Sequence, residues 1–163
     1  MSAAAKTDSN QVYIGLGSNI DPEQNLRVAV EALRQSAQLK ALSHAWRSAA
    51  VGSAGPEFLN AAACLETPLD PAALKARVLV PIEQALGRVR TADPNAPRTI
   101  DLDILVVNQS VLDEDIWRYA HLAVPLGELC PLLTQPDGTH TLQAIAERLR
   151  ASTDIQPVPG LWS

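Results

Sequence analysis

Two aspartates, Asp101 and Asp103, stand two positions apart in a segment that reads TIDLDIL. The alternation of polar and apolar residues predicts a β-strand, in which side chains two positions apart point to the same face. Both carboxylates then project side by side, while Leu102 and Ile104 face the core. Carboxylate oxygens suit Mg²⁺, which commonly takes one or two protein carboxylates and completes its shell with water and substrate phosphates. The pair is therefore a candidate metal site for a bound polyphosphate.

Three arginines precede this strand, namely Arg88, Arg90 and Arg98. A guanidinium group presents a planar fork of N–H donors that matches phosphate oxygens bidentately. For Arg98 the alternative is a solvated ion pair with Asp101. For Arg88 the alternative is a cation that only complements the dipole at the end of a helix. Arginines and paired carboxylates together favour the chemistry of a metal-bound polyphosphate.

Four longer motifs occur in a fixed order: YIGLGSN at 13–19, FLNAA at 58–62, GRVR at 87–90 and APRTIDLDIL at 96–105. Through these motifs the chain resembles the 6-hydroxymethyl-7,8-dihydropterin pyrophosphokinases of folate biosynthesis. The resemblance is strong from about residue 12 to 108 and then thins to Pro125-Leu126 and a PDG turn at 136–138. It implies an ATP-dependent enzyme that transfers a pyrophosphoryl group to the hydroxymethyl group of the pterin and releases AMP.

The resemblance also implies roles for the charged residues. Asp101 and Asp103 would hold two Mg²⁺ ions that bridge the triphosphate of ATP, the co-substrate. Arg88 and Arg98 would neutralise charge on the transferred β-phosphoryl group, and Arg90 would contribute to substrate binding. No residue in these motifs is an obvious strong general base, which suits phosphoryl-type transfer, where positioning and electrostatics dominate.

Two residues of the FLNAA motif correspond to the family's pterin site. Phe58 stands where the family has an aromatic ring that stacks on the pterin, and Asn60 matches an asparagine that binds the polar edge of the pterin. For Phe58 the alternative is an ordinary core residue of a sheet. For Asn60 it is an amide that bridges backbone groups within the sheet, because a buried amide must find hydrogen-bond partners.

The chain departs from the family pattern at several positions: Asn95 replaces a tryptophan, Asp113 lies near a missing histidine, Tyr119 replaces an arginine and His121 replaces the second stacking phenylalanine. The imidazole of His121 is flat and can still stack on a pterin, so His121 is predicted to form the second wall of the slot. The alternative is a partly buried histidine with a satisfied hydrogen bond. Arg118 is a candidate to replace the absent arginine.

The remaining sequence predicts the elements that position these residues. The second helix contains Pro81, which predicts a kink or break near Ala76 or Arg77. Two loops rich in glycine or proline, 49–57 and 91–97, are predicted to be mobile. The order of elements is typical of an α+β ferredoxin-like sandwich, with helices packed on one face of an antiparallel sheet. The predicted strands cover 12–17, 39–47, 58–66 and the Asp-x-Asp segment, and the predicted helices begin at Asp21 as N-cap, at Asp70, and at Leu142 after Thr141 as cap.

Size and composition bound the other possibilities. The chain has 163 residues and predicts a flexible tail over 1–10 followed by a single domain over 11–163. Its formal net charge of −5 gives no general basic surface for nucleic acid, so the expected partners are ATP and a pterin. The start lacks the apolar segment of a signal peptide, and no apolar run is long enough to span a membrane. A cytoplasmic protein is therefore predicted.

Two alternative functions remain open at this point. One is a divergent paralogue that keeps the ATP and metal half of the site and acts on another pterin. The other is a module that binds a nucleotide without catalysis. Retention of both Asp101 and Asp103 argues against a non-catalytic module, because adjacent negative charges are unfavourable unless they serve a ligand.

Overall fold

The computed structural model describes residues 9–49, 55–89, 92 and 97–162. Almost all of the predicted tail, most of the two predicted loops, and the residues Arg90 and Asn95 therefore lie outside the described residues. The first strand begins at Asn10, the last residue of the predicted tail.

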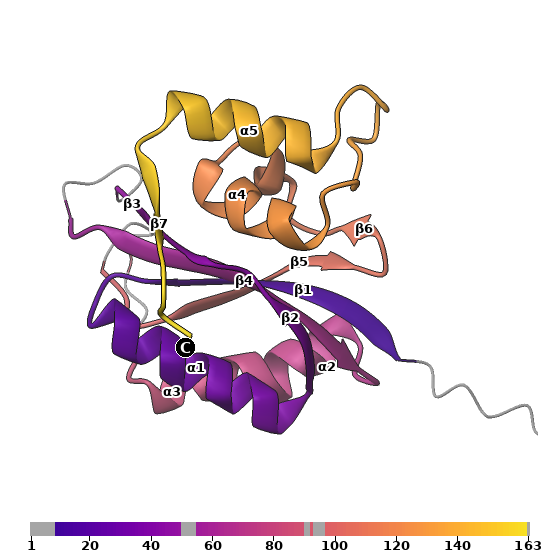
Figure 1. The fold of residues 1–163 in the computed structure, drawn as a ribbon. Helices are drawn as coiled ribbons and strands as arrows, with labels where there is room; N and C mark the ends of the chain where they lie inside the picture. Colours follow the sequence, from indigo (N-terminus) through magenta and orange to yellow (C-terminus); the bar gives the residue numbers. More distant parts are fainter. Residues whose placement is uncertain (1–8, 50–54, 90–91, 93–96, 163) are drawn as a thin grey trace, which may run out of the picture.

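One antiparallel sheet of seven strands forms the middle of the protein (Figure 1). Its strands follow the order β6-β5-β1-β4-β3-β7, and β2 also pairs with β4. The central strands β1 and β4 pair along their whole length, from Asn10 opposite Thr67 to Ser18 opposite Leu59. The strands are β1 (Asn10–Ser18), β2 (Gln38–Leu42), β3 (Ala45–Ser48), β4 (Phe58–Thr67), β5 (Asp101–Val107), β6 (Ser110–Val111) and β7 (Ile155–Val158).

Helices cover both faces of the sheet, with α4 and α5 on one face and α1, α2 and α3 on the other (Figure 1). The α+β sandwich is confirmed, but the prediction that helices cover one face is wrong. The helices are α1 (Pro22–Ser36), α2 (Pro71–Leu74), the π-helical turn η1 (Lys75–Leu79), α3 (Val80–Ala85), the 3₁₀ turn η2 (Glu114–Trp117), α4 (Ala120–Leu129) and α5 (Leu142–Ser152).

Hydrophobic residues are buried on both faces of the sheet, which explains why helices cover both faces. Val12 and Ile14 of β1 belong to the core beneath α1, whereas Tyr13 belongs to the core beneath α4 and α5. Seven consecutive residues of β1 are buried, so this strand has no solvated face. A strand that is apolar on both faces needs cover on both sides. The helix α4 was not predicted because Pro125, near its middle, cannot donate the usual backbone hydrogen bond and disguises the helix.

The second predicted helix is interrupted where Pro81 requires it. Pro81 has no N–H to donate to the carbonyl of Arg77, four residues earlier. The chain forms a π-turn over Lys75–Leu79, and the N–H of Val80 donates to the carbonyl of Lys75, five residues earlier. The predicted break near Ala76 or Arg77 is thus confirmed, as a π-turn within an otherwise continuous helical path.

Two other predicted details differ. The strand over 39–47 is divided into β2 and β3 at Ser43. The backbone N–H of Ser43 donates to the carbonyl of Ala62 in β4, and its hydroxyl accepts from the N–H of Ala62.

Asp21 precedes α1 in a left-handed conformation with φ of 42° and makes no side-chain cap bond. The amide of Asn25 instead donates to the carbonyl of Ile20. Thr141 does cap α5 as predicted, since its side chain accepts from the N–H of Ala144.

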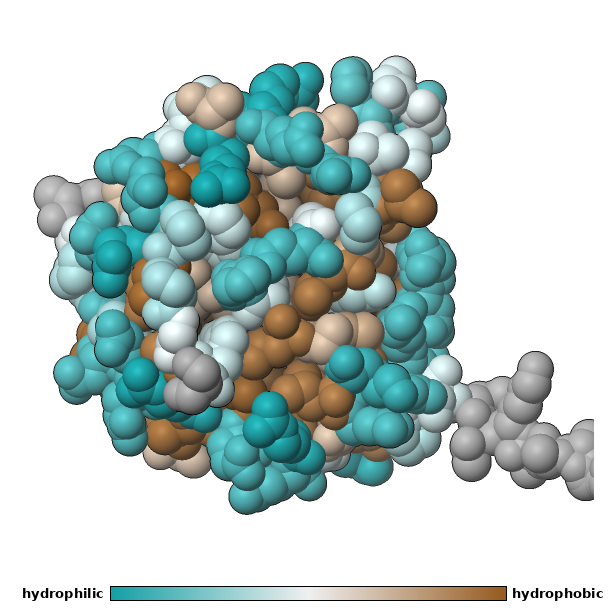
Figure 2. Space-filling model, viewed as in Figure 1, coloured by the Kyte–Doolittle hydropathy of each residue, from teal (hydrophilic) through white to brown (hydrophobic). Residues whose placement is uncertain are grey.

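The surface carries both hydrophilic and hydrophobic side chains (Figure 2). On the face seen in Figure 2, hydrophilic side chains occupy most of the outline, and hydrophobic surface gathers toward the middle of the view. Within the described ranges, no helix combines the length and apolar character needed to cross a bilayer.

The last described residues fasten the edge strand β7 to the opposite side of the sheet. β7 pairs with β3, and Leu161 is buried in the core beneath α1 with 4% of its surface exposed. The Nε of Arg27 in α1 donates to the carbonyl of Leu161 at 3.1 Å, and the indole Nε1 of Trp162 donates to the carbonyl of Ser43 at 2.8 Å. Leu161 and Trp162 therefore contribute to the stability of the fold.

We expect Leu161→Ala to lower the free energy of unfolding by about 2–4 kcal/mol, because the substitution leaves a cavity in the core. Urea denaturation followed by circular dichroism measures this change. Leu132→Ala is the matched control, since Leu132 is 77% exposed and its truncation should change stability by less than about 0.5 kcal/mol. Equal effects of the two substitutions would contradict a core role for Leu161.

Candidate active site

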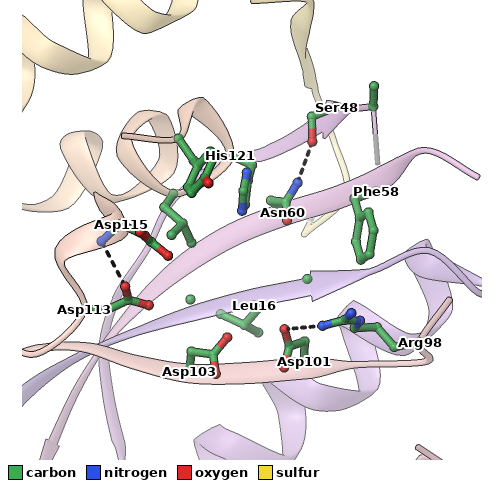
Figure 3. A pocket seen from close by; sticks show the side chains of 15 residues that line it. Leu16, Ser48, Phe58, Asn60, Arg98, Asp101, Asp103, Asp113, Asp115 and His121 are labelled. Atoms are coloured by element: carbon green, nitrogen blue, oxygen red, sulfur yellow. Dashed lines mark hydrogen bonds and ion pairs between the residues drawn. The ribbon is translucent and has the colours of Figure 1, made fainter. Parts of the chain in front are cut away.

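A cavity of about 270 Å³ opens between the sheet and the segment that leads into α4 (Figure 3). The floor is formed by β1, β4 and β5, and the wall by residues 113–122. Six of the predicted site residues line this cavity: Phe58, Asn60, Arg98, Asp101, Asp103 and His121. Residues from segments far apart in sequence therefore meet in one place.

The carboxylates of Asp101 and Asp103 both face the cavity, as strand alternation predicts (Figure 3). Gly17 lies opposite Asp101, and Gly15 lies opposite Asp103, on the neighbouring strand β1. Neither glycine places a side chain on the floor. A Cβ atom at Gly17 would lie only 3.0 Å from Oδ1 of Asn60 in β4, so any larger residue would crowd the amide of Asn60.

Asp101 is neutralised by two arginines in this structure. Its Oδ1 accepts from Nη1 of Arg88 at 2.7 Å, and its Oδ2 accepts from Nη1 of Arg98 at 3.1 Å. Arg98 lines the cavity and also lies over the ring of Phe58, with 5.9 Å between its Cζ and the ring centroid. The ion pair considered as an alternative for Arg98 is present, and it leaves the guanidinium on the cavity wall.

Asp103 differs from Asp101 because no described residue forms an ion pair with it. Burial, together with the negative charge of Asp101, raises the pKa of the Asp103 carboxyl to about 7. The residue as a whole still keeps exposed surface toward the cavity, so solvent screening moderates both effects. A cation bound beside Asp103 would relieve the repulsion between the two carboxylates.

Asp101 and Asp103 form a candidate metal site of two carboxylates. Within the described residues, no group of three or more histidine, cysteine or acidic side chains is placed to hold a metal ion. Two carboxylates without further protein ligands match Mg²⁺, which retains waters and binds substrate phosphates in its remaining positions. They do not match the closed sites with four protein ligands that are typical of structural zinc.

Asn60 lies between Phe58 and His121 in the cavity (Figure 3). The side chain of Asn60 is buried, and its Nδ2 donates to Oγ of Ser48 at 2.9 Å. This bond leaves Oδ1 directed over Gly17. The alternative of an amide bridging backbone groups is not what the structure shows, since the partner of Asn60 is a side chain.

His121 is the second residue of α4. Burial lowers the pKa of its imidazole below the ordinary value of 6.5, although the charges of Asp115, Asp101 and Asp113 act in the opposite direction. The ring is therefore neutral near neutral pH. It lies beside the ring of Tyr119, with 5.5 Å between centroids and 30° between planes.

The wall also contains residues that sequence reasoning did not place in the site. Asp113 and Asp115 line the cavity, and the carboxylate of Asp113 accepts from the N–H of Asp115 at 3.0 Å. Arg118, the candidate substitute for a missing arginine, is absent from the described residues that line the cavity. Its Nη1 lies 3.5 Å from Oδ1 of Asp115, and its Cζ lies 5.2 Å from the ring centroid of Tyr119.

Arg88 does not line the cavity, but it contacts Asp101, which does. Its side chain is 11% exposed and contacts two carboxylates, Asp101 and Glu83. Burial lowers the pKa of Arg88, but the charges of Asp101 and Glu83 outweigh this effect and raise it, so the guanidinium remains charged. Sequence reasoning did not identify Glu83, because one acidic residue in a helix usually faces solvent.

The fold and the cavity together define a class of α+β proteins with an acidic, arginine-flanked site beside an aromatic slot. The sequence model of one family, described as 7,8-dihydro-6-hydroxymethylpterin-pyrophosphokinase, matches residues 13–131. The chain belongs to this family.

Individual relatives agree with this assignment. The 2-amino-4-hydroxy-6-hydroxymethyldihydropteridine pyrophosphokinase of Pseudomonas aeruginosa is 35% identical over 148 residues, which covers 83% of this chain and 90% of the relative. The protein of the same name from Synechocystis sp. is 30% identical, with coverage of 99% of this chain and 89% of the relative. A crystal structure of Plasmodium falciparum HPPK-DHPS shares the fold, with a TM-score of 0.67 at 10% identity over 91% of this chain. This chain spans 47% of that longer protein.

Proposed function

We propose that this chain transfers the pyrophosphoryl group of ATP to the hydroxymethyl group of 6-hydroxymethyl-7,8-dihydropterin and releases AMP, a reaction of folate biosynthesis. The observation that carries the proposal is a single cavity in which Asp101, Asp103 and Arg98 lie beside Phe58, Asn60 and His121. The first group suits a metal-bound triphosphate, and the second suits a flat heterocycle with a polar edge. The curated relatives carry the names of this activity.

The proposed reaction is a displacement at phosphorus. The hydroxymethyl oxygen forms a bond to the β-phosphorus, the bond from that phosphorus to the oxygen bridging the α- and β-phosphates breaks, and AMP leaves. The hydroxyl proton passes to solvent. No described cavity residue needs to act as a strong base, because in this type of transfer most of the catalysis comes from positioning and charge stabilisation.

Asp101 and Asp103 are the residues proposed to hold Mg²⁺, with two ions expected. Their fit rests on the carboxylate pair itself, whose two negative charges lie side by side on one strand. When bound, the cation would supply charge neutralisation and orientation of the triphosphate. Arg98, on the same wall, is placed to bind phosphate oxygens, and the role proposed for Arg88 is to hold charge behind Asp101.

Phe58, Asn60 and His121 are proposed to bind the pterin. The rings of Phe58 and His121 offer stacking surfaces on either side of Asn60. The hydrogen bond from Nδ2 of Asn60 to Ser48 fixes the orientation of the amide. In this orientation Oδ1 can accept from an N–H group of the pterin edge. This slot would therefore select a heterocycle that presents N–H donors along one edge.

The direct test uses purified protein with ATP, Mg²⁺ and 6-hydroxymethyl-7,8-dihydropterin, and AMP is measured by chromatography. We expect AMP and the pyrophosphorylated pterin to form in equal amounts, and to require both the pterin and Mg²⁺. Release of AMP without pterin, or no turnover under any Mg²⁺ concentration, would contradict the proposal.

A divergent substrate is the second candidate, and the wall of the cavity favours it specifically. Tyr119 and His121 stand where the family resemblance places an arginine and a phenylalanine, and both line the cavity. A related pterin with a different substituent is the expected substrate in that case. A competition assay with a panel of hydroxymethyl-pterins, in oxidised and reduced forms, ranks the substrates by kcat/KM.

We expect His121→Ala to weaken pterin binding by about 1–3 kcal/mol, whereas His121→Phe should preserve or tighten it, because the phenyl ring offers a larger stacking face. Burial keeps the imidazole neutral, so binding to the wild type should be constant from about pH 7 upward and change only below the ordinary histidine range. Titration of pterin into the complex with a non-hydrolysable ATP analogue provides the dissociation constants. If His121→Ala binds as tightly as wild type, His121 does not line the pterin slot.

A further inference from the structure

We propose that Glu83 is a positioning residue that retains Arg88 at the active site, so that Asp101 is free to exchange its arginine partners for a metal ion. This inference rests on the proposed function. Glu83 is the only charged side chain among the buried residues of the described ranges, with 5% of its surface exposed. A buried carboxylate is costly unless it is paired and hydrogen-bonded, so its environment deserves a functional explanation.

Two groups of the site bind the same oxygen of Glu83. Its Oε2 accepts from Nη1 of Arg88 at 2.8 Å and from the backbone N–H of Leu102 at 2.9 Å. Leu102 lies between Asp101 and Asp103 in β5. Glu83 therefore connects the arginine directly to the strand that carries the carboxylate pair.

Arg88 is attached to Glu83 by its backbone as well as by its side chain. The N–H of Arg88 donates to the carbonyl of Glu83 at 3.0 Å, where the chain leaves α3. The same Nη1 that contacts Glu83 also donates to Oδ1 of Asp101 at 2.7 Å. Arg88 is thus shared between one carboxylate that is buried and one that faces the cavity.

The carboxylates of Glu83 and Asp101 differ in their access to the cavity. The side chain of Glu83 is 6% exposed and lies outside the described residues that line the cavity, whereas the side chain of Asp101 is 24% exposed and lines it. A cation entering the cavity can approach Asp101 but not Glu83. If Asp101 bound a cation in place of Arg88, the ion pair between Arg88 and Glu83 would keep the charge of Arg88 within the site.

A purely structural role for the ion pair between Glu83 and Arg88 predicts a different result. Loss of the pair would destabilise the fold but would leave kcat of the folded enzyme nearly unchanged, whether Arg88 is present or not. A positioning role is therefore tested by a double-mutant cycle, in which the effect of changing Glu83 is measured with and without Arg88. The readout is kcat, KM for ATP, and the free energy of unfolding for each protein.

The variants are Glu83→Gln, Arg88→Met and the double variant. Glutamine keeps the size of the side chain and an acceptor for the N–H of Leu102, but it removes the charge that holds Arg88. We expect Glu83→Gln to lower kcat by about 10- to 100-fold with a smaller change in KM, which is the scale of a misplaced catalytic group. In the Arg88→Met background the same change should alter kcat by less than about 3-fold, since the arginine that Glu83 is proposed to position is already absent.

Glu31→Gln provides the matched control. Glu31 forms an exposed pair with Arg34 on α1, at 3.5 Å, and both side chains are more than half exposed. The control should leave kcat and KM unchanged. Glu83→Asp, which keeps the charge on a shorter side chain, should recover part of the loss seen with Glu83→Gln.

The outcomes separate the inference from the proposed function. Wild-type turnover in Glu83→Gln, or an undiminished loss in the Arg88→Met background, overturns the positioning role. If Glu83→Gln does not fold, Arg88→Met and the double variant still decide the question, because removing both members of a buried pair is better tolerated than removing one. Equal kcat/KM for these two supports the role, and a further loss of about 10-fold or more in the double variant refutes it. Absence of AMP formation by the wild type refutes the proposed function itself.

Discussion

Asp103→Asn is expected to remove nearly all turnover while leaving the fold as stable as the wild type or more stable. The carboxylate is unpaired among the described residues and is repelled by Asp101, so its charge opposes folding in the absence of a cation. Turnover should fall by at least about 100-fold, because loss of a metal ligand removes stabilisation of the charge on the triphosphate. Enzyme assays across a Mg²⁺ titration, with urea denaturation of the metal-free protein, measure both effects.

Asp101→Asn should abolish turnover to a similar extent but should also lower stability, because Asp101 pairs with both Arg88 and Arg98. This contrast between two neighbouring aspartates serves as an internal control for general damage to β5. Asp137→Asn, at an exposed turn, should leave activity unchanged. Near-wild-type AMP formation in either Asp101→Asn or Asp103→Asn would refute the metal assignment.

Arg98→Ala is expected to lower kcat by about 100-fold or more while changing ATP binding in the ground state much less. The guanidinium lies on the cavity wall between Asp101 and the ring of Phe58, where it can contact the phosphoryl group that moves. A contact that strengthens as charge develops affects kcat more than binding. Pre-steady-state measurement of the chemical step and titration with a non-hydrolysable ATP analogue separate the two quantities.

Arg98→Lys retains a positive charge without the planar fork and should recover only part of the rate. Arg34→Ala, at the exposed pair on α1, is the control for loss of an arginine elsewhere. An unchanged kcat in Arg98→Ala, accompanied by weaker ATP binding, would assign Arg98 to uniform binding of the nucleotide. A lower affinity for pterin alone would assign it to support of Phe58.

The parts of the site that could be predicted are those fixed by local geometry or carried by the family motifs. Alternation along β5 is sufficient to place Asp101 and Asp103 on one face, and the strand is confirmed over Asp101–Val107. Phe58 and Asn60 were placed by resemblance, and both line the cavity. The position of His121, counted back from Pro125-Leu126, also brings it to the cavity, although its binding role remains a prediction.

Other features depend on contacts between distant segments, which local patterns do not reveal. The pairing of Glu83 with Arg88 and with the N–H of Leu102 exists only once α3 packs against β5. The side chain of Asn19 accepts from the backbone N–H of Arg98 and donates to the carbonyl of Pro56, both of which are distant from it in sequence. Asn19 belongs to the YIGLGSN motif, but the motif does not reveal these contacts, and Glu83 lies in none of the four motifs.

The pairing of β7 with β3 has a consequence for the order in which this protein folds during synthesis. Ala45 of β3 lies opposite Val158 of β7, so the two strands are separated by most of the chain. One edge of the sheet therefore stays without its neighbour until residues 155–162 have left the ribosome. An open edge presents unpaired N–H and carbonyl groups to other chains. Nascent chains stalled before residue 155 should thus aggregate more readily than chains released after residue 162.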